Sequence, residues 1–266
     1  ELTTASGEKV PLLGVDVHAE IMEAGQRVRV RQRFKNIEPN PIEAVYKFPL
    51  PDVAAVCGFT LLIGGRRVTA KVEQRETAFQ AYDKAMSEGN LAALLDQERP
   101  NIFTAGVGGV QPGEEVVAEI QYVAPIERCK NSVRVVMPMT IAPRYSPSGA
   151  DTSDERQVIP PYAADVPYGL TLKAKFTMAS DVVKVTSPSY DIKAAVKGNT
   201  ATVELRSGKA AMDRDLIVEA EMSAAAAPVA FISKNGRRHT AMVRFIPDMK
   251  QYRGTAGPKE AVFVVD

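Results

Sequence analysis

Few side chains in this sequence could catalyse a reaction. It has two histidines, His18 and His239. A serine or cysteine nucleophile needs a base within reach, but we interpret both histidines as ordinary surface residues, one on the polar side of a strand and one at a turn. Carboxylates cluster at 96–98, 113–115 and 212–215, and two of these clusters adjoin turn residues, as solvated acids do. We therefore expect no catalytic residues and no enzyme.

Motifs for cofactors and metals are not found either. The sequence has no Walker loop, no Gly-x-Ser-x-Gly and no His-Glu-x-x-His. The glycine-rich segment 106–110 lies between two predicted strands, so it does not favour a phosphate site. Cys57 and Cys129 are too few for a zinc site of four ligands or a disulfide framework. We expect no cofactor and no metal, and interpret the cysteines as buried free thiols, with a bridge between them as the alternative.

A row of four arginines is the strongest local charge feature. Arg27, Arg29, Arg31 and Arg33 alternate with other residues in "QRVRVRQRF", so they share one side of a predicted strand. Four guanidinium groups about 7 Å apart could bind phosphates. No aromatic residues interleave with them to stack on bases, so we expect no nucleic-acid partner. The favoured interpretation is a solvent-facing row that pairs with acidic residues of a neighbouring strand, and we retain it as a possible interaction surface.

Alternating apolar and polar residues predict the strands that position these side chains. Val15, Val17, Ala19 and Ile21 point to one side, as in a half-buried strand. Tight turns are predicted at Gly64–Gly65 and at Gly198–Asn199. Further strands are expected at 27–34, 101–107, 116–123, 133–137, 170–178, 215–222, 229–232 and 239–245.

One segment, 74–90, has helical periodicity instead. Phe79, Tyr82 and Met86 recur at helical spacing, and Gly89 is placed to end the helix. The expected fold is therefore mainly β, an antiparallel β-sandwich with one docked α-helix, followed by a second β-rich region.

The composition is that of a globular protein with no strong overall field. Of the 266 residues, 45% are hydrophobic, and 33 basic against 32 acidic residues give a net charge of +1. No apolar run is long enough to span a membrane, and Glu1 does not open a signal peptide. Two unpaired cysteines favour a reducing compartment, the cytoplasm, over secretion or the cell surface.

Two polar segments divide the chain. Residues 146–167 are rich in Pro, Ser and Asp and lack periodicity, which predicts a loop or linker. Residues 248–260 are interpreted as a second linker before the apolar run 261–266. The pattern leaves open whether the β-rich region 168–247 forms a sandwich of its own or extends the sheets of residues 1–145.

From Pro11 to Tyr145 the sequence resembles the VIT (vault protein inter-alpha-trypsin) domain. The resemblance is carried by "VPLLGVDVHAEI", "VRVRQRFKN", "PIEAVYKFPLPDVAAVCGF", "ETAFQAYDKAMSEG", "LAALLDQERPNIFTAGVGGVQPGEEV", "YVAPI" and "IAPRY". Around Cys57, "CGF" is most similar to the bacterial and intracellular branch. One departure is Gly109, where the family usually has Asn.

The resemblance implies a non-enzymatic interaction or scaffold module that precedes and packs with a von Willebrand factor type A domain, with a protein partner of unknown identity. "AVFVVD", residues 261–266, resembles the first strand of that domain, and Asp266 the first ligand of its metal-ion-dependent adhesion site. No Ser-x-Ser follows Asp266, so no metal is expected in this chain. The alternative function is an extracytoplasmic, adhesin-like sandwich that binds a surface or a carbohydrate.

Overall fold

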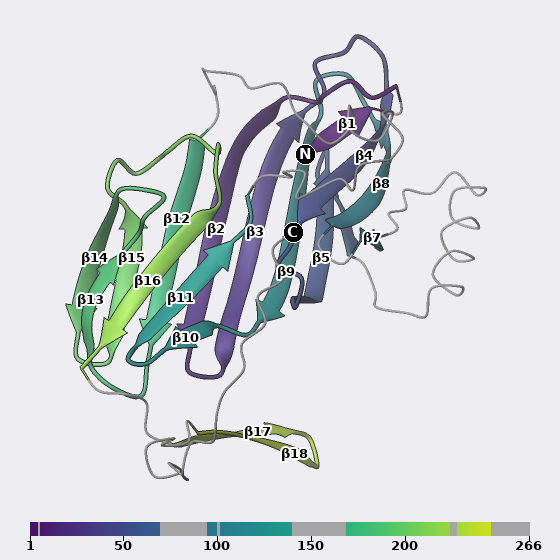
Figure 1. Ribbon diagram of the computed structural model, residues 1–266. Coiled ribbons are helices and arrows are strands. Elements are labelled where there is room, and N and C mark those ends of the chain that lie inside the picture. Colours follow the sequence, from purple (N-terminus) through teal and green to yellow (C-terminus); the bar gives the residue numbers. More distant parts are fainter. Residues whose placement is uncertain (5, 70–94, 100–101, 140–168, 224–227, 246–266) are drawn as a thin grey trace, which may run out of the picture. The chain divides into compact units, whose positions relative to one another are not determined.

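The computed structural model describes residues 1–4, 6–69, 95–99, 102–139, 169–223 and 228–245 (Figure 1). Two units separate by their contacts, Glu1–Ala225 and Ala226–Asp266. The strands are β1 (Leu2–Thr4), β2 (Leu12–Met22), β3 (Gly25–Lys35), β4 (Ile42–Pro49), β5 (Ala55–Ile63), β6 (Arg66–Thr69), β7 (Leu95–Arg99), β8 (Ile102–Val110), β9 (Glu115–Ala124), β10 (Glu127–Cys129), β11 (Ser132–Met137), β12 (Gly169–Thr177), β13 (Val182–Thr186), β14 (Ile192–Lys197), β15 (Thr200–Leu205), β16 (Leu216–Met222), β17 (Val229–Asn235) and β18 (Arg238–Arg244).

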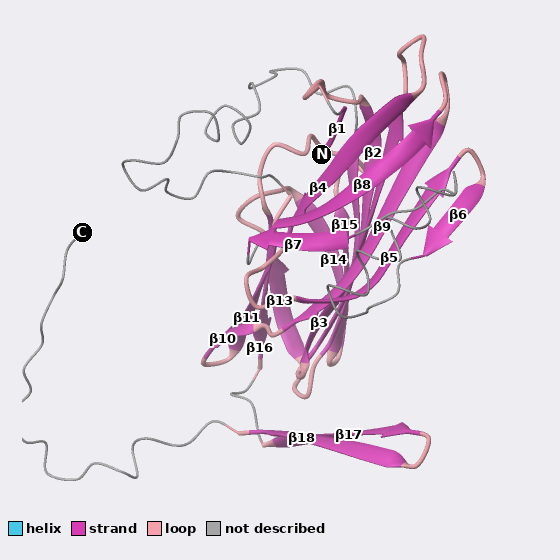
Figure 2. Ribbon diagram, turned by 90° about the vertical axis from the view of Figure 1, so that its right-hand side faces the viewer, coloured by secondary structure: helices cyan, strands magenta, loops and turns pink. Residues whose placement is uncertain are grey.

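The first unit is built on one eight-stranded sheet in the order β14-β15-β12-β2-β3-β9-β5-β6. The unit also contains two four-stranded sheets, β1-β4-β8-β7 and β10-β11-β16-β13. Strands β11 and β16 lie in front of the large sheet in Figure 1, and Figure 2 shows β4 and β8 from the side. All three sheets contribute to a single buried cluster, so the unit is a layered β-sandwich and the predicted mainly β class is confirmed.

The alternation seen in the sequence decides which side of each strand is buried. In β2, Val15, Val17 and Ile21 are fully covered, and in β12 Leu170 and Phe176 are equally inaccessible. Because successive side chains of a strand point to opposite faces, the intervening polar residues lie on the other side of the sheet. The large sheet thus has one face in the core and one face toward solvent.

Aromatic rings fill the core where β4 covers the large sheet. The ring of Tyr46 lies 6.1 Å from Phe34, 6.3 Å from Phe48 and 5.9 Å from Phe59, measured between ring centroids. Its hydroxyl donates a hydrogen bond of 2.9 Å to Oε1 of Gln32. Both side chains are buried, so this polar pair is satisfied internally rather than by solvent.

Both tight turns are confirmed. Gly64 and Gly65 have φ values of 51° and 83°, and Gly198 has a φ of 56°, the left-handed conformation that two-residue hairpin turns need. The predicted docked helix, 74–90, lies outside the described residues, and the described residues contain no helix. The run 261–266 lies outside them as well.

One pair of strands departs from the antiparallel prediction. β12 runs parallel to β2, from Gly169 beside Gly14 to Thr177 beside Met22. Parallel neighbours need a long connection, and most of the chain lies between these two strands. In the four-stranded sheet β10-β11-β16-β13, β16 pairs with β11. Strands from the regions before and after residues 146–167 therefore share two sheets.

Gly109 takes a conformation that explains why glycine can replace asparagine there. It lies near the end of β8, where the register with β4 shifts between Ile42 and Ala44. Its φ is 69°, and no atom lies within 4 Å of the position that a Cβ would take. Asparagine tolerates this left-handed region better than most residues do, so either residue suits this irregularity of β8.

A buried ion pair connects strand β10 with two turns of the first unit. Glu23, between β2 and β3, accepts hydrogen bonds of 2.9 and 3.0 Å from Nη2 of Arg128 in β10. The backbone N–H of Ala179, just after β12, donates a third bond of 3.1 Å to Glu23. The side chains of Arg128 and Glu23 are only 10% and 2% exposed, so solvent screens this pair little.

The second unit contains the hairpin β17–β18. Its register pairs Val229 with Arg244 and Asn235 with Arg238, and Gly236 in the turn has a φ of 59°. Both strands were expected from the sequence.

Candidate interaction surfaces

The four arginines of β3 lie on the solvent-facing side of the large sheet. We call this surface the arginine face. It consists of the outward side chains of β12, β2, β3 and β9: Thr171, Lys173, Lys175, Asp16, His18, Glu20, Arg27, Arg29, Arg31, Arg33, Val117, Glu119, Gln121 and Val123. Arg27, Arg29 and Arg31 are exposed, as predicted, whereas Arg33 is half-buried, with its guanidinium group above Gly14.

The register places acidic residues beside two of these arginines. Arg27 lies opposite Glu20, and Arg31 lies between Asp16 and Glu119. The expected pairing forms at one of the two sites, where Nη1 of Arg27 is 3.8 Å from Oε2 of Glu20. Within the described part of the chain, Arg29 and Arg31 make no ion pair. Arg29 and Arg31 therefore keep their charge available to a partner.

His18 lies in the middle of the arginine face, with a cation on each side. In the pairing register, His18 lies beside Arg29 of β3 and beside Lys173 of β12. Burial, and then the charges of Arg29 and Lys173, hold the pKa of His18 below its ordinary value of 6.5.

We expect His18 to make the fold less stable in mild acid. Because its folded-state pKa is lowered, the unfolded chain binds the proton first, and stability falls as the pH drops through about 6.5, levelling off below the lowered pKa. His18→Gln should reduce the difference between the free energies of unfolding at about pH 7.5 and about pH 5.5. The exposed His239 provides the control as His239→Gln. An unchanged pH dependence in His18→Gln would contradict the expectation.

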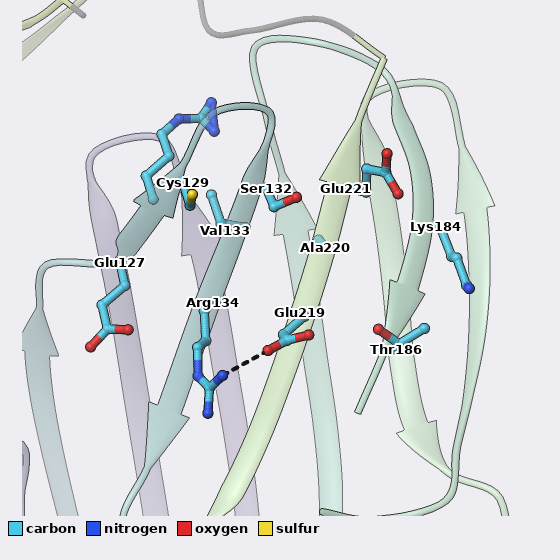
Figure 3. Close-up of a pocket in the computed structure, with 11 residues that line it drawn as sticks. Glu127, Cys129, Ser132, Val133, Arg134, Lys184, Thr186, Glu219, Ala220 and Glu221 are labelled. Atoms are coloured by element: carbon cyan, nitrogen blue, oxygen red, sulfur yellow. Dashed lines mark hydrogen bonds and ion pairs between the residues drawn. The ribbon is translucent and has the colours of Figure 1, made fainter. Parts of the chain in front are cut away.

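A shallow depression on the outer side of the sheet β10-β11-β16-β13 is a second candidate. Its volume is about 460 Å³, within the range of ligand sites. The cross-strand pairs form two polar rows, which Figure 3 shows standing on one face: Glu127, Arg134, Glu219 and Thr186 in one row, and Cys129, Ser132, Glu221 and Lys184 in the other.

Charges within the depression largely balance one another. Nη1 of Arg134 lies 3.0 Å from Oε1 of Glu219, and Nδ2 of Asn131 donates a bond of 3.3 Å to Glu221. No histidine lines it. We did not predict this site from the sequence. The spacing of Glu219 and Glu221 predicts that they share one face of β16. No local pattern predicts which strands lie beside β16.

The remaining candidate residues are not brought together. Cys57 in β5 and Cys129 in β10 are free and exposed, so the prediction of buried thiols is wrong. Cys129 lies in the short strand β10. Cys57 lies where the register of β5 with β9 shifts. Asp266 lies outside the described residues. No group of three or more potential metal ligands occurs among the residues that the structure describes.

Residues 12–122 match the family model of the Vault protein inter-alpha-trypsin domain. The chain carries a VIT domain. The match contains β2 and β3 and ends within β9, so it includes all four arginines of the arginine face and not Lys173.

The VIT domain is shared with two larger animal proteins. The rat von Willebrand factor A domain-containing protein 5A is 29% identical over 285 residues, covering 100% of this chain and 34% of the rat protein. The human protein mono-ADP-ribosyltransferase PARP4 is 28% identical over 254 residues, covering 93% of this chain and 15% of the human protein. The chain thus spans about a third or less of these relatives.

Among solved structures, an M1 zinc metallopeptidase from Deinococcus radiodurans aligns with 94% of this chain and 50% of its own chain, at a TM-score of 0.39 and 11% identity. A likeness at that level supports no shared activity.

In the described part of this VIT protein, no helix has the length and apolar character that a membrane crossing requires.

Proposed function

We propose that this chain is a protein-interaction module without catalytic activity, which works together with a von Willebrand factor type A domain. The observation that carries the proposal is the alignment of the whole chain, VIT domain included, with a protein named for its von Willebrand factor A domain. An alignment that continues beyond residue 122 supports a unit larger than the VIT domain alone.

The surfaces of the first unit suit such a role. The arginine face offers exposed charges on the large sheet, and the depression offers polar side chains on a second sheet. Surfaces of this kind recognise partners through charge complementarity and hydrogen bonds. A catalytic role has less support. The PARP4 relative owes its name to a transferase activity, but this chain covers only 15% of that protein.

Affinity capture tests the interaction function. The gene product that contains this chain, and a version lacking residues 1–225, are used as baits in lysate of the source organism, and the bound proteins are compared by mass spectrometry. We expect a defined set of partners to disappear when the first unit is deleted. An unchanged set of partners would contradict the proposal.

Activity assays test the absence of catalysis. The purified chain is incubated with NAD⁺ and acceptor proteins, and with ester, glycoside and phosphate substrates. We expect no turnover above the buffer rate. Turnover that scales with protein concentration and is lost on unfolding would show that the chain is an enzyme.

A further inference from the structure

We propose that the arginine face binds an extended, acidic segment of a partner protein, laid along β3. This inference rests on the proposed interaction function and specifies the chemistry of the partner. Its basis is the local charge, the spacing of the arginines and the open surface on which they lie.

Cations outnumber carboxylates on the arginine face. The cationic side chains are Arg27, Arg29, Arg31, Arg33, Lys173 and Lys175, and the carboxylates are Asp16, Glu20 and Glu119. The excess of three positive charges, without His18, is larger than the net charge of +1 for the whole chain. A local excess of one sign attracts a partner surface of the other sign.

Two of the three carboxylates are engaged by neutral neighbours. Asp16 accepts a hydrogen bond of 2.7 Å from Oγ1 of Thr171. Glu119 accepts one of 3.2 Å from Nε2 of Gln121. These bonds hold the two carboxylates without an ion pair to Arg31, although both lie beside it in register. Arg31 and Arg29 are therefore free to bind carboxylates from outside.

The spacing of the arginines selects an extended partner. Every second residue of a strand points to the same face, so neighbouring guanidinium groups are anchored about 7 Å apart. A peptide in extended conformation repeats its own side chains at the same interval. A segment with Asp or Glu at every second position therefore places one carboxylate near each arginine, and arginine binds carboxylates with two parallel hydrogen bonds.

The charges run in stripes, which favours a peptide over nucleic acid. Asp16 and Glu20 of β2 flank the arginines of β3. A peptide can place neutral or basic side chains over β2, whereas a phosphate backbone cannot. None of the outward residues of the arginine face is Phe, Tyr or Trp, so bases would find no large aromatic ring to stack on.

His18 makes this binding dependent on pH. The charged groups around it are Asp16 and Glu20 on its own strand, Arg27, Arg29 and Arg31 on β3, Lys173 and Lys175 on β12, and Glu119 on β9. In the free protein, burial and the adjacent cations Arg29 and Lys173 disfavour its protonation. Carboxylates of a bound segment favour the protonated form, so binding takes up a proton, and affinity rises as the pH falls from about 7.5 to about 5.5.

Fluorescence anisotropy with a labelled peptide of about eight residues, alternating Glu and Thr, tests the proposal. An isomer with the same composition but with its Glu residues in one block is the matched probe. We expect the alternating peptide to bind several-fold more tightly. Arg29→Glu should weaken that binding about tenfold, because an attraction becomes a repulsion. Arg29 lies opposite His18 and Gln121, so the reversed charge meets no carboxylate directly across the strands and the fold should persist.

Three further variants make the test specific. Arg31→Gln removes one charge without repulsion and should weaken binding by a smaller factor. Lys184→Glu makes the same kind of charge change in the depression and should leave affinity within about twofold of the wild type. His18→Gln should abolish the rise in affinity between about pH 7.5 and about pH 5.5. Thermal unfolding of each variant confirms that it is folded.

Several results would overturn the inference. They are equal binding of the two peptides, unchanged affinity in Arg29→Glu, loss of binding in Lys184→Glu, or tighter binding of duplex DNA or phosphatidylserine vesicles through the same arginines. If capture of partners by the longer protein still depends on residues 1–225, the interaction function stands and only the acidic-segment inference fails. If that capture is independent of residues 1–225, the interaction function itself fails.

Discussion

Replacing Glu23 by alanine is expected to lower the free energy of unfolding of the first unit by about 3–5 kcal/mol. The carboxylate accepts hydrogen bonds from Arg128 and from the backbone of Ala179. Without it, a guanidinium group that is only 10% exposed loses its buried counter-charge. Urea denaturation followed by circular dichroism measures the loss.

An exposed ion pair in the same unit provides the control. Nζ of Lys193 lies 3.1 Å from Glu204, and both side chains are about half exposed, at 59% and 48%. Lys193→Ala should change the free energy of unfolding by less than about 1 kcal/mol, because solvent weakens such pairs. Similar losses in Glu23→Ala and Lys193→Ala would mean that the buried pair contributes no more than a surface one.

Replacing Tyr46 by alanine should lower the free energy of unfolding by about 3–5 kcal/mol. Its ring contacts three other aromatic rings in the core, so truncation leaves a cavity. Tyr46→Phe keeps the ring but removes the hydroxyl that donates to Gln32. This leaves a buried acceptor, at a cost of about 1–3 kcal/mol.

A double variant separates the hydrogen bond from the packing at Tyr46. Tyr46→Phe combined with Gln32→Leu replaces both polar partners by apolar groups, and it should recover much of the stability that Tyr46→Phe alone loses. Chemical denaturation of Tyr46→Phe, Gln32→Leu and the double variant measures the recovery. A double variant whose loss equals the sum of the single losses would show that the two side chains are not coupled.

Long strands with one buried face were predictable because their pattern is local. The alternation of Val15, Val17 and Ile21 against polar residues follows directly from burial of one side of β2. We did not predict β4, although Ala44, Tyr46 and Phe48 alternate inward along it. β14 carries little such signal, since Ile192 is its only residue in the core.

The candidate surface was predictable only in part, for a related reason. The arginines of β3 are neighbours in sequence, so their shared face could be predicted from spacing. Lys173 lies beside His18 because β12 pairs with β2, and no local pattern encodes pairing between segments so far apart. The cations around His18, and hence its lowered pKa, therefore became visible only in the folded structure.

The parallel pairing of β2 and β12 also has a consequence for biosynthesis. Asp16 and its partner Thr171 are 155 residues apart in the chain. At a synthesis rate of about 5–20 residues per second, β2 waits on the order of ten seconds before β12 has been made. During that time the hydrogen-bonding edge of β2 that faces away from β3 has no native partner. The nascent chain is then open to pairing with other strands, and a ribosome-associated chaperone would act with most effect in this interval.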